Sequence, residues 1–314
     1  MTVPPPTPDP AVNVTNVNYV GFETPDIDRL VEYYTKVLAF KLVDRSQERA
    51  YLTTGFEHHC VVLTRSDVAR GRTTLGFEIA EPLADAQRRL RAAGHDAERR
   101  TDIGPGTPDV LVVEEPTTGT PLHLLPGQEP SGTRPSWLSP TKLSHVAGYT
   151  PDLGTLDRFY REVLGFKWSD GVSDFFVFVR CNADHHSANF MESTKLKGLH
   201  HVAFECRDPG HVISMVDHLS EQGYRLDWGP GRHGPGHNFF TYHKDPDGNV
   251  VELSAQLDRM DETRGYWEPR PWHETFPMYP KIWDPADPDA ANVWGPGHLG
   301  RDSSGELTSP LRER

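Results

Sequence analysis

The sequence predicts an α+β protein of two similar halves, each holding two modules in which a strand leads into a helix and then into further strands. The prediction comes from an internal repeat, because self-similarity at a fixed spacing means that one structural unit is used again. Three pairs of segments match in order along the chain: 17–44 with 143–170, 75–98 with 201–227, and 114–125 with 244–255. The four modules are followed by a C-terminal extension outside the repeat.

The first matched pair has the pattern of a strand, a Thr-Pro-Asp segment and an amphipathic helix, followed by Val-Leu-x-Phe-Lys. Apolar residues recur at the period of a helix that buries one face. They are Ile27, Leu30, Val31, Tyr34, Val37 and Leu38 in the first half, and Leu153, Leu156, Tyr160, Val163 and Leu164 in the second. Asp26 and Asp152 follow prolines and are suited to cap the start of each helix.

The remaining matched pairs predict a strand and a helix, then a turn and a strand, with Gly119 and Gly248 as the turn residues. Residues 1–12 form a proline-stiffened tail, and residues 127–141 form a linker rich in Pro, Gly and Ser. Residues 257–314 are rich in Trp and Pro, and we expect them to wrap around the second half.

The composition is that of a soluble globular protein, with 25% charged residues and a net charge of −13. The negative charge argues against nucleic acid or an anionic membrane as a partner. No apolar run approaches the roughly 20 residues that a membrane span needs, and the N-terminus lacks the pattern of a secretory signal. Three scattered cysteines predict neither a disulfide framework nor a zinc site, so we expect a reducing cytoplasm.

The two halves differ where the second carries three residues suited to bind a metal. His145 aligns with Tyr19, His201 with Thr74, and Glu252 with His123, at offsets of 126, 127 and 129 residues. Two neutral imidazoles and one carboxylate with open positions are the ligand set of the non-haem Fe(II) oxygenases. The sequence thus predicts one metal site, in the second half. His58 and His59 of the first half are expected to be exposed loop residues.

Several motifs of the second half resemble those of the type I extradiol catechol dioxygenases of the vicinal oxygen chelate superfamily. The motifs are LSHVAG, CNADHHS, GLHHVAFE, GPGRHG and TYHKDPDGNVVEL. The resemblance implies two tandem vicinal oxygen chelate domains of paired βαβββ modules. Residues 13–126 would form a degenerate domain without metal, residues 142–256 the catalytic domain, and residues 257–314 an extension.

The resemblance also implies roles for individual residues. The second histidine of the His-His pair, His201, would bind the metal, and strand alternation would turn His200 to the other face. His186 would act as the acid–base residue beside O2, with His185 as a bystander. His233 and Tyr242 would contact the catecholate. The implied cofactor is Fe(II), or alternatively Mn(II), with O2 as co-substrate, in a cytoplasmic homo-oligomer that degrades aromatic compounds.

Two other functions remain open on the same scaffold: a glyoxalase-like metal-dependent lyase or isomerase, and a non-catalytic module that binds ligands without metal. For ring cleavage, the substrate pocket is predicted to be apolar. Trp228 directly precedes GPGRHG, and Phe176 and Phe178 lie on one face of a strand that leads to CNADHHS. Three arginines could instead serve an anionic substrate, and their directions are not set by the sequence: Arg232, Arg264 and Arg270.

Overall fold

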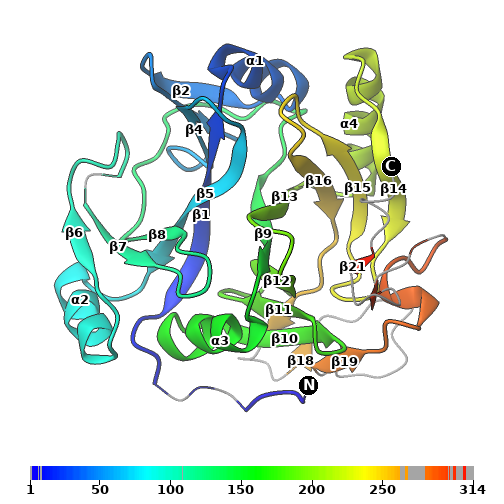
Figure 1. The fold of residues 1–314 in the computed structure, drawn as a ribbon. Coiled ribbons are helices and arrows are strands. Elements are labelled where there is room, and N and C mark those ends of the chain that lie inside the picture. Colours follow the sequence, from blue (N-terminus) through cyan, green and yellow to red (C-terminus); the bar gives the residue numbers. More distant parts are fainter. Residues whose placement is uncertain are drawn as a thin grey trace.

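The structure is a computed structural model that describes residues 2–5, 7, 9–107, 109–261, 266–267, 280–295, 297, 300–301 and 307–308. Arg264 and Arg270 lie outside the described residues. Two large sheets dominate the fold, one from each half of the chain, with β1 and β9 adjacent at the middle of the molecule (Figure 1). Among the described residues, no helix is long and apolar enough to cross a membrane.

The first sheet has eight strands in the order β2-β3-β4-β1-β5-β8-β7-β6. Helices α1 (Ile27–Glu32) and α2 (Leu83–Ala92) follow the first strand of each module. The strands are β1 (Val14–Thr24), β2 (Lys41–Arg45), β3 (Arg49–Thr53), β4 (Val61–Arg65), β5 (Arg70–Ile79), β6 (Glu98–Arg100), β7 (Val110–Glu114) and β8 (Pro121–Leu125).

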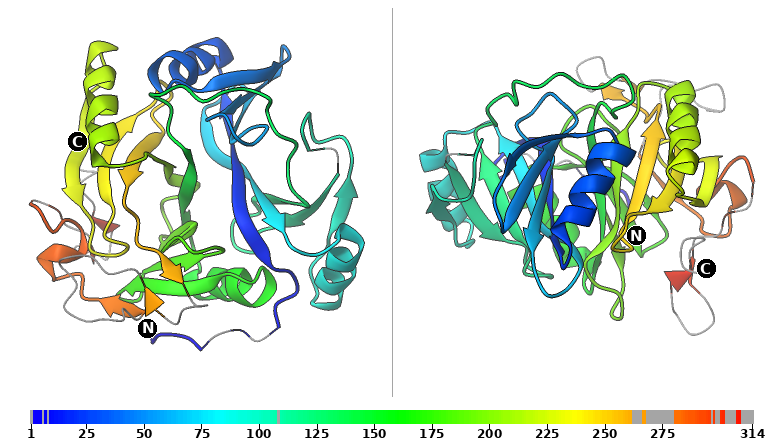
Figure 2. Two further views of the ribbon diagram at one scale, coloured as in Figure 1. Left: turned by 180° about the vertical axis from the view of Figure 1, so that it is seen from behind. Right: turned by 90° about the horizontal axis from the view of Figure 1, so that it is seen from above.

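The second sheet has the order β14-β15-β16-β13-β9-β12-β11-β10-β19. Helices α3 (Leu153–Arg158) and α4 (Pro209–Glu221) again follow the first strand of each module, and α4 is the yellow-green helix in both views of Figure 2. Apart from β19, the second sheet repeats the order of the first sheet, which confirms the four βαβββ modules. Its strands are β9 (Lys142–Thr150), β10 (Lys167–Val172), β11 (Phe176–Arg180), β12 (Ala188–Glu192), β13 (Leu199–Glu205), β14 (Leu226–Arg232), β15 (Phe239–Lys244), β16 (Val250–Ala255) and β19 (Lys281–Trp283).

The extension contributes β19, which pairs in parallel with β10 at the edge of the second sheet. Two further pairs of short strands lie outside the large sheets. They are β17 (Met260–Asp261) with β18 (Tyr266–Trp267), and β20 (Gly300–Arg301) with β21 (Leu307–Thr308).

Both predicted helix starts are present. The carboxylate of Asp26 accepts a hydrogen bond from the Arg29 N–H at 3.1 Å, and that of Asp152 accepts one from the Thr155 N–H at 2.9 Å. The predicted helices are not α-helical throughout, because α1 and α3 each continue into a π-helical turn, Tyr33–Val37 and Phe159–Val163. The same irregularity in both halves is a further mark of the repeat.

The halves exchange aromatic side chains across their interface. Phe40 of the first half packs edge-on against Phe204 of β13, with ring centroids 5.0 Å apart. Reciprocally, Phe166 of the second half packs against Phe77 of β5 at 5.6 Å. These rings belong to a single cluster of buried apolar side chains that runs through both halves.

Hydrogen bonds join the halves at the same interface. The Tyr33 hydroxyl lies 2.7 Å from Nε2 of His243, and the Tyr160 hydroxyl donates to Glu115 at 2.8 Å. Glu115 also pairs with the buried guanidinium of Arg72 at 3.1 Å. Because a buried charge is costly unless it is paired, this network ties the helix of one half to the sheet of the other.

Candidate active site

The three predicted metal ligands meet on adjacent strands of the second sheet. His145 lies on β9, His201 on β13 and Glu252 on β16. Ala203 of β13 is opposite His145 on one side and opposite Glu252 on the other. Because side chains two residues apart on a strand share a face, His201 points to the same side as Ala203. The small Ala203 side chain leaves room for the three longer ones to converge.

The distances between the converging atoms fit a single metal ion. Nε2 of His145 lies 3.1 Å from Nε2 of His201, and Oε2 of Glu252 lies 3.3 Å and 3.2 Å from these two nitrogens. Ligands bound at about 2.0–2.2 Å from one ion are separated by such distances. Among the described residues, this is the group of histidine, cysteine and acidic side chains placed to hold a metal.

The protonation states also suit a metal. Burial, followed by the neighbouring histidines, lowers the pKa of His201 well below its usual value. Burial alone would raise the pKa of Glu252, but the hydrogen bond and charge of His145 outweigh it, and the pKa is lowered. A neutral imidazole and an ionised carboxylate are the forms that bind divalent cations.

Outer contacts hold each ligand in place. The Asn238 side-chain amide donates to Oε1 of Glu252 at 2.8 Å, and the Ser144 hydroxyl lies 3.2 Å from Nδ1 of His145. Nδ1 of His200 lies 2.6 Å from Nδ1 of His201. If Nε2 of His201 binds a metal, its Nδ1 carries the proton and donates it to His200, and such contacts fix the orientation of a ligating imidazole.

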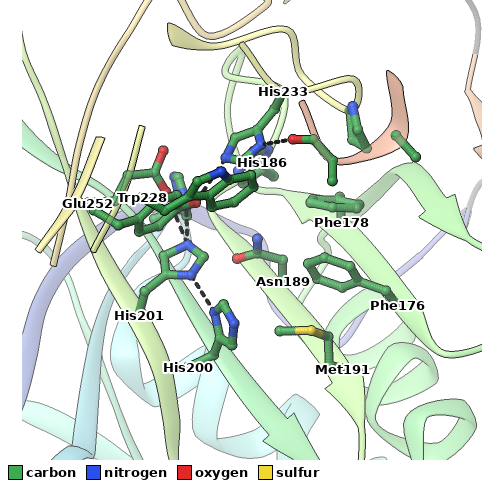
Figure 3. Close-up of a pocket in the computed structure, with 15 residues that line it drawn as sticks. Phe176, Phe178, His186, Asn189, Met191, His200, His201, Trp228, His233 and Glu252 are labelled. Carbon is green, nitrogen blue, oxygen red and sulfur yellow. Dashed lines mark hydrogen bonds and ion pairs between the residues drawn. The ribbon is translucent and has the colours of Figure 1, made fainter. Parts of the chain in front are cut away.

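The expected orientation of His200 is wrong. A bulge in the pairing of β13 with β9, between Leu199 and His201, interrupts the strict alternation of side chains. A bulge re-aims side chains in this way, and His200 lines the same pocket as His201 (Figure 3). Sequence reasoning missed this contact because a bulge between Leu199 and His201 leaves no mark in the sequence.

His186 lies beside the ligand cluster. Its ring centroid is 4.2 Å from that of His145, and burial lowers its pKa well below the usual value, so the imidazole is neutral near pH 7. His185 is not a bystander on the surface. It is buried, with Nδ1 at 3.0 Å from Nδ1 of His186 and Nε2 at 3.2 Å from the Asp170 carboxylate. Asp170 and His185 thus form a chain of contacts that holds the His186 ring in position.

Tyr242 and His233 form a linked pair on the other side of the cluster. Nδ1 of His233 lies 2.7 Å from the Ala291 carbonyl, which can only accept, so this nitrogen carries the proton of the neutral ring. Nε2 of His233 is then an acceptor, and the Tyr242 hydroxyl donates to it at 2.9 Å. Burial, followed by the charge of Glu252, raises the pKa of Tyr242, which keeps the phenol protonated. Trp228 stacks on Tyr242, with ring centroids 5.5 Å apart.

The three predicted ligands, His186, His200, His233, Tyr242 and Trp228 border one cavity, with about 550 Å³ of space between protein atoms that is partly open to solvent. Opposite the ligands lies an apolar wall that includes Phe176, Phe178 and Met191 (Figure 3). Asn189 interrupts this wall, and its buried Oδ1 has no hydrogen-bond partner within the described part of the chain. Neither Met191 nor Asn189 stands in a motif that would select it from the sequence, although both lie on β12 directly opposite Phe176 and Phe178.

No lysine or arginine is among the described residues that line this cavity. Arg232 turns away from it: the guanidinium donates to the His237 carbonyl at 2.9 Å and to the Gln256 side chain at 3.0 Å. The same group lies over the ring of Trp294. The guanidinium of Arg232 is therefore committed to other partners.

Comparisons with known proteins agree with this geometry. The chain is 36% identical over 121 residues to metapyrocatechase 2 of Cupriavidus necator, a match spanning 38% of each protein. It is 26% identical to metapyrocatechase of Geobacillus stearothermophilus, over 84% of this chain and 87% of that protein. It is also 33% identical to the uncharacterized protein YqjT of Bacillus subtilis, over 36% of this chain and 98% of that protein.

Solved structures share the fold of nearly the whole chain. A Mn(II)-bound glyoxalase from Novosphingobium aromaticivorans is 27% identical with a TM-score of 0.78, over 90% of this chain and 91% of that chain. Homoprotocatechuate 2,3-dioxygenase from Brevibacterium fuscum, solved with 3,4-dihydroxyphenylacetate, is 24% identical with a TM-score of 0.77, over 97% of this chain and 98% of that one.

The family model described as Glyoxalase/Bleomycin resistance protein/Dioxygenase superfamily matches residues 142–253. That range contains the ligand cluster and all of the motifs on which the resemblance rests. The chain therefore belongs to this superfamily, and its resemblance to the extradiol dioxygenases within the superfamily is confirmed.

Proposed function

We propose that the protein is an extradiol ring-cleaving dioxygenase, which inserts both atoms of O2 into a substituted catechol and yields a ring-opened, semialdehyde-type product. The observation that carries the proposal is the cluster of His145, His201 and Glu252, which directs three ligand atoms into a pocket lined by aromatic side chains. The two metapyrocatechase relatives support it. The reaction would serve the breakdown of aromatic compounds.

Fe(II) is the proposed cofactor, with Mn(II) as the alternative, because both ions accept two imidazoles and one carboxylate. When bound, the ion supplies a Lewis acid that lowers the pKa of the catechol hydroxyls and a place at which the ring and O2 meet. We expect one metal per chain, held within residues 142–256.

The side chains around the ligands supply the proton chemistry. His186 is neutral and buried beside His145, so it can accept a phenolic proton and return it later in the reaction. Tyr242 stays protonated, and its single hydroxyl proton, which His233 accepts in this structure, can be turned to an ionised substrate oxygen when a catechol binds. Trp228 and Phe178 form walls that keep water from the reacting ring.

Two measurements test the proposal. Protein purified anaerobically should contain one iron or manganese per chain, and a screen of catechols in air should give a yellow ring-fission product. The His201→Ala variant should lose both the metal and the activity, whereas His218→Ala, which alters a helix residue outside the pocket, should retain both. Full metal occupancy in His201→Ala would overturn the assignment of the site.

A glyoxalase-like lyase is the second candidate, because one of the structural neighbours is a Mn(II)-bound glyoxalase. Such chemistry usually needs a further carboxylate ligand, and the described residues place one carboxylate, that of Glu252, in the cluster. It also leaves no role for His186 or Tyr242. Manganese content does not separate the two functions, so the comparison rests on turnover of a catechol with O2 against turnover of a glutathione hemithioacetal without O2.

The resemblance also implies a homo-oligomer in the cytoplasm. Light scattering coupled to size-exclusion chromatography tests the first point, and cell fractionation tests the second.

A further inference from the structure

The first half contains a second cavity in its own sheet, with about 370 Å³ of space between protein atoms that is partly open to solvent. It borders β1, β3, β4, β5 and β8. A loop covers one end: Ile103 and Thr107 line the cavity, and a side chain at Gly104 would collide with the Tyr51 hydroxyl. His59 lies in this cavity and is buried, so the expectation that it is an exposed loop residue is wrong.

This cavity occupies the position of the catalytic pocket in the other half. Gly76 of β5 is opposite Tyr19 on one side and opposite His123 on the other. Ala203 has the same relation to His145 and Glu252. Thr74 is opposite Gly21, as His201 is opposite Ala147. The three residues aligned with the metal ligands therefore sit at the corresponding points of the first sheet.

The wall opposite these residues also matches. Tyr51 pairs with Val62 on the neighbouring strand, as Phe178 pairs with Asn189. His59 stands where His186 stands, since Nδ1 of His59 lies 3.0 Å from Nδ1 of His58, as in the His185–His186 pair. The His59 ring packs on Tyr19 with centroids 4.7 Å apart, as that of His186 packs on His145.

What differs is the chemistry of the lining. In place of metal ligands, the Tyr19 hydroxyl lies 2.6 Å from Nδ1 of His123, and the Thr74 hydroxyl donates to the Pro121 carbonyl at 2.9 Å. Arg49 pairs with Thr64 where Phe176 pairs with Met191, so a guanidinium replaces a phenyl ring. The cavity of the first half therefore lacks the metal ligands and carries the positive charge of Arg49 instead.

Arg49 is the charged side chain that a ligand in this cavity would contact. Burial, followed by the neighbouring histidines, lowers the pKa of His59 to about 3. Burial, followed by the charges of Arg49 and Arg100, lowers the pKa of His123 to about 4, so both rings are neutral at pH 7. The guanidinium of Arg49 donates to the Ile103 carbonyl at 2.7 Å and has no carboxylate partner among the described residues. The nearby Arg100, by contrast, is paired with Asp102 at 2.8 Å.

We propose that this cavity is a second binding site, for a small planar carboxylate of about the size of one ring. Arg49 would hold the carboxylate, because a guanidinium matches that group with two parallel hydrogen bonds. The rings of Tyr19, Tyr51 and His59 would pack against the unsaturated body, and the hydroxyls of the cavity would bind its polar edge. The site does not depend on the ring-cleaving activity proposed for the other half.

The test is a titration of the full-length, metal-loaded protein with 4-fluorobenzoate, followed by fluorine NMR. We expect saturable binding to one site per chain. Arg49→Leu should weaken it at least tenfold, which corresponds to about 1.4 kcal/mol, and Arg49→Lys should restore part of the affinity. Arg88→Leu, which removes an exposed arginine of α2, is the matched control and should bind as the unaltered protein does.

Two further experiments test whether binding occurs in this cavity and not in the catalytic pocket. Thr64→Met, which gives the cavity the side chain found in the other half, should block binding while thermal unfolding shows a folded protein. With the catalytic pocket filled by 4-nitrocatechol under anaerobic conditions, 4-fluorobenzoate should bind unchanged. Displacement by the catechol, equal affinity in Arg49→Leu, or no saturable binding would each overturn the proposal.

Discussion

Phe176→Arg should reverse the substrate preference of the catalytic pocket, because it places there the guanidinium that the corresponding strand of the first half carries in Arg49. In the unaltered protein, Phe176 packs on Phe178 with ring centroids 4.2 Å apart and faces the cavity with Met191. A propyl substituent buried against this wall gains about 0.8 kcal/mol per methylene, or roughly 2 kcal/mol. A carboxylate buried there without a paired cation costs several kcal/mol.

The assay compares kcat/KM for 4-propylcatechol with that for 3,4-dihydroxyphenylacetate. The unaltered protein should favour the alkyl substrate by at least tenfold, or about 1.4 kcal/mol. In Phe176→Arg that ratio should fall below one, a change of at least tenfold. Phe56→Arg, at an exposed phenylalanine of the first half, should change nothing. A tenfold preference of the unaltered protein for the acid would refute the apolar pocket and leave ring cleavage intact.

Three further predictions concern single side chains. Asn238→Ala removes the donor to Glu252 and should weaken metal binding 10- to 100-fold in a chelator competition; unchanged affinity would exclude the positioning role. His186→Phe should keep the metal and bind catechol, but lose 10²- to 10⁴-fold in kcat; an unaltered rate across pH 6–9 would contradict this. His243 is buried, and its pKa is lowered from 6.5 to about 3. Between these two pH values the His243 imidazole is protonated in the unfolded chain but not in the folded one. Acid therefore lowers the free energy of unfolding by up to about 1.4 kcal/mol per pH unit. In His243→Gln the fall in unfolding free energy from pH 6.5 to 5.5, measured with denaturant, should be smaller by about 1 kcal/mol, because the unfolded imidazole is already half protonated at pH 6.5; an identical fall would exclude His243 as the source.

The repeat made much of the site predictable from the sequence. Alignment of the halves is, in effect, alignment of strand registers, so the mismatches at Tyr19, Thr74 and His123 marked the points where three strands meet. The prediction of the ligand cluster rests on those mismatches together with the family motifs. The apolar wall followed from Phe176 and Phe178 by strand alternation.

Other features depend on contacts that the sequence does not encode locally. The bulge that returns His200 to the pocket arises where β13 and β9 pair, and the amide of Asn238 reaches Glu252 from a loop. His59 is expected to be an exposed loop residue because it belongs to the half in which the sequence predicts no metal site. Its burial becomes intelligible only once the cavity around it is compared with the catalytic one.

The exchange of rings between the halves has a consequence for any attempt to work with one half. Cutting the chain in the linker would strip Phe40 from Phe204 and Tyr33 from His243, and would leave Arg72 and Glu115 without Tyr160. Each fragment would then expose an aromatic, aggregation-prone surface to water. Neither half is therefore expected to fold when it is expressed alone or transferred to another protein. The two halves should unfold together in a single transition.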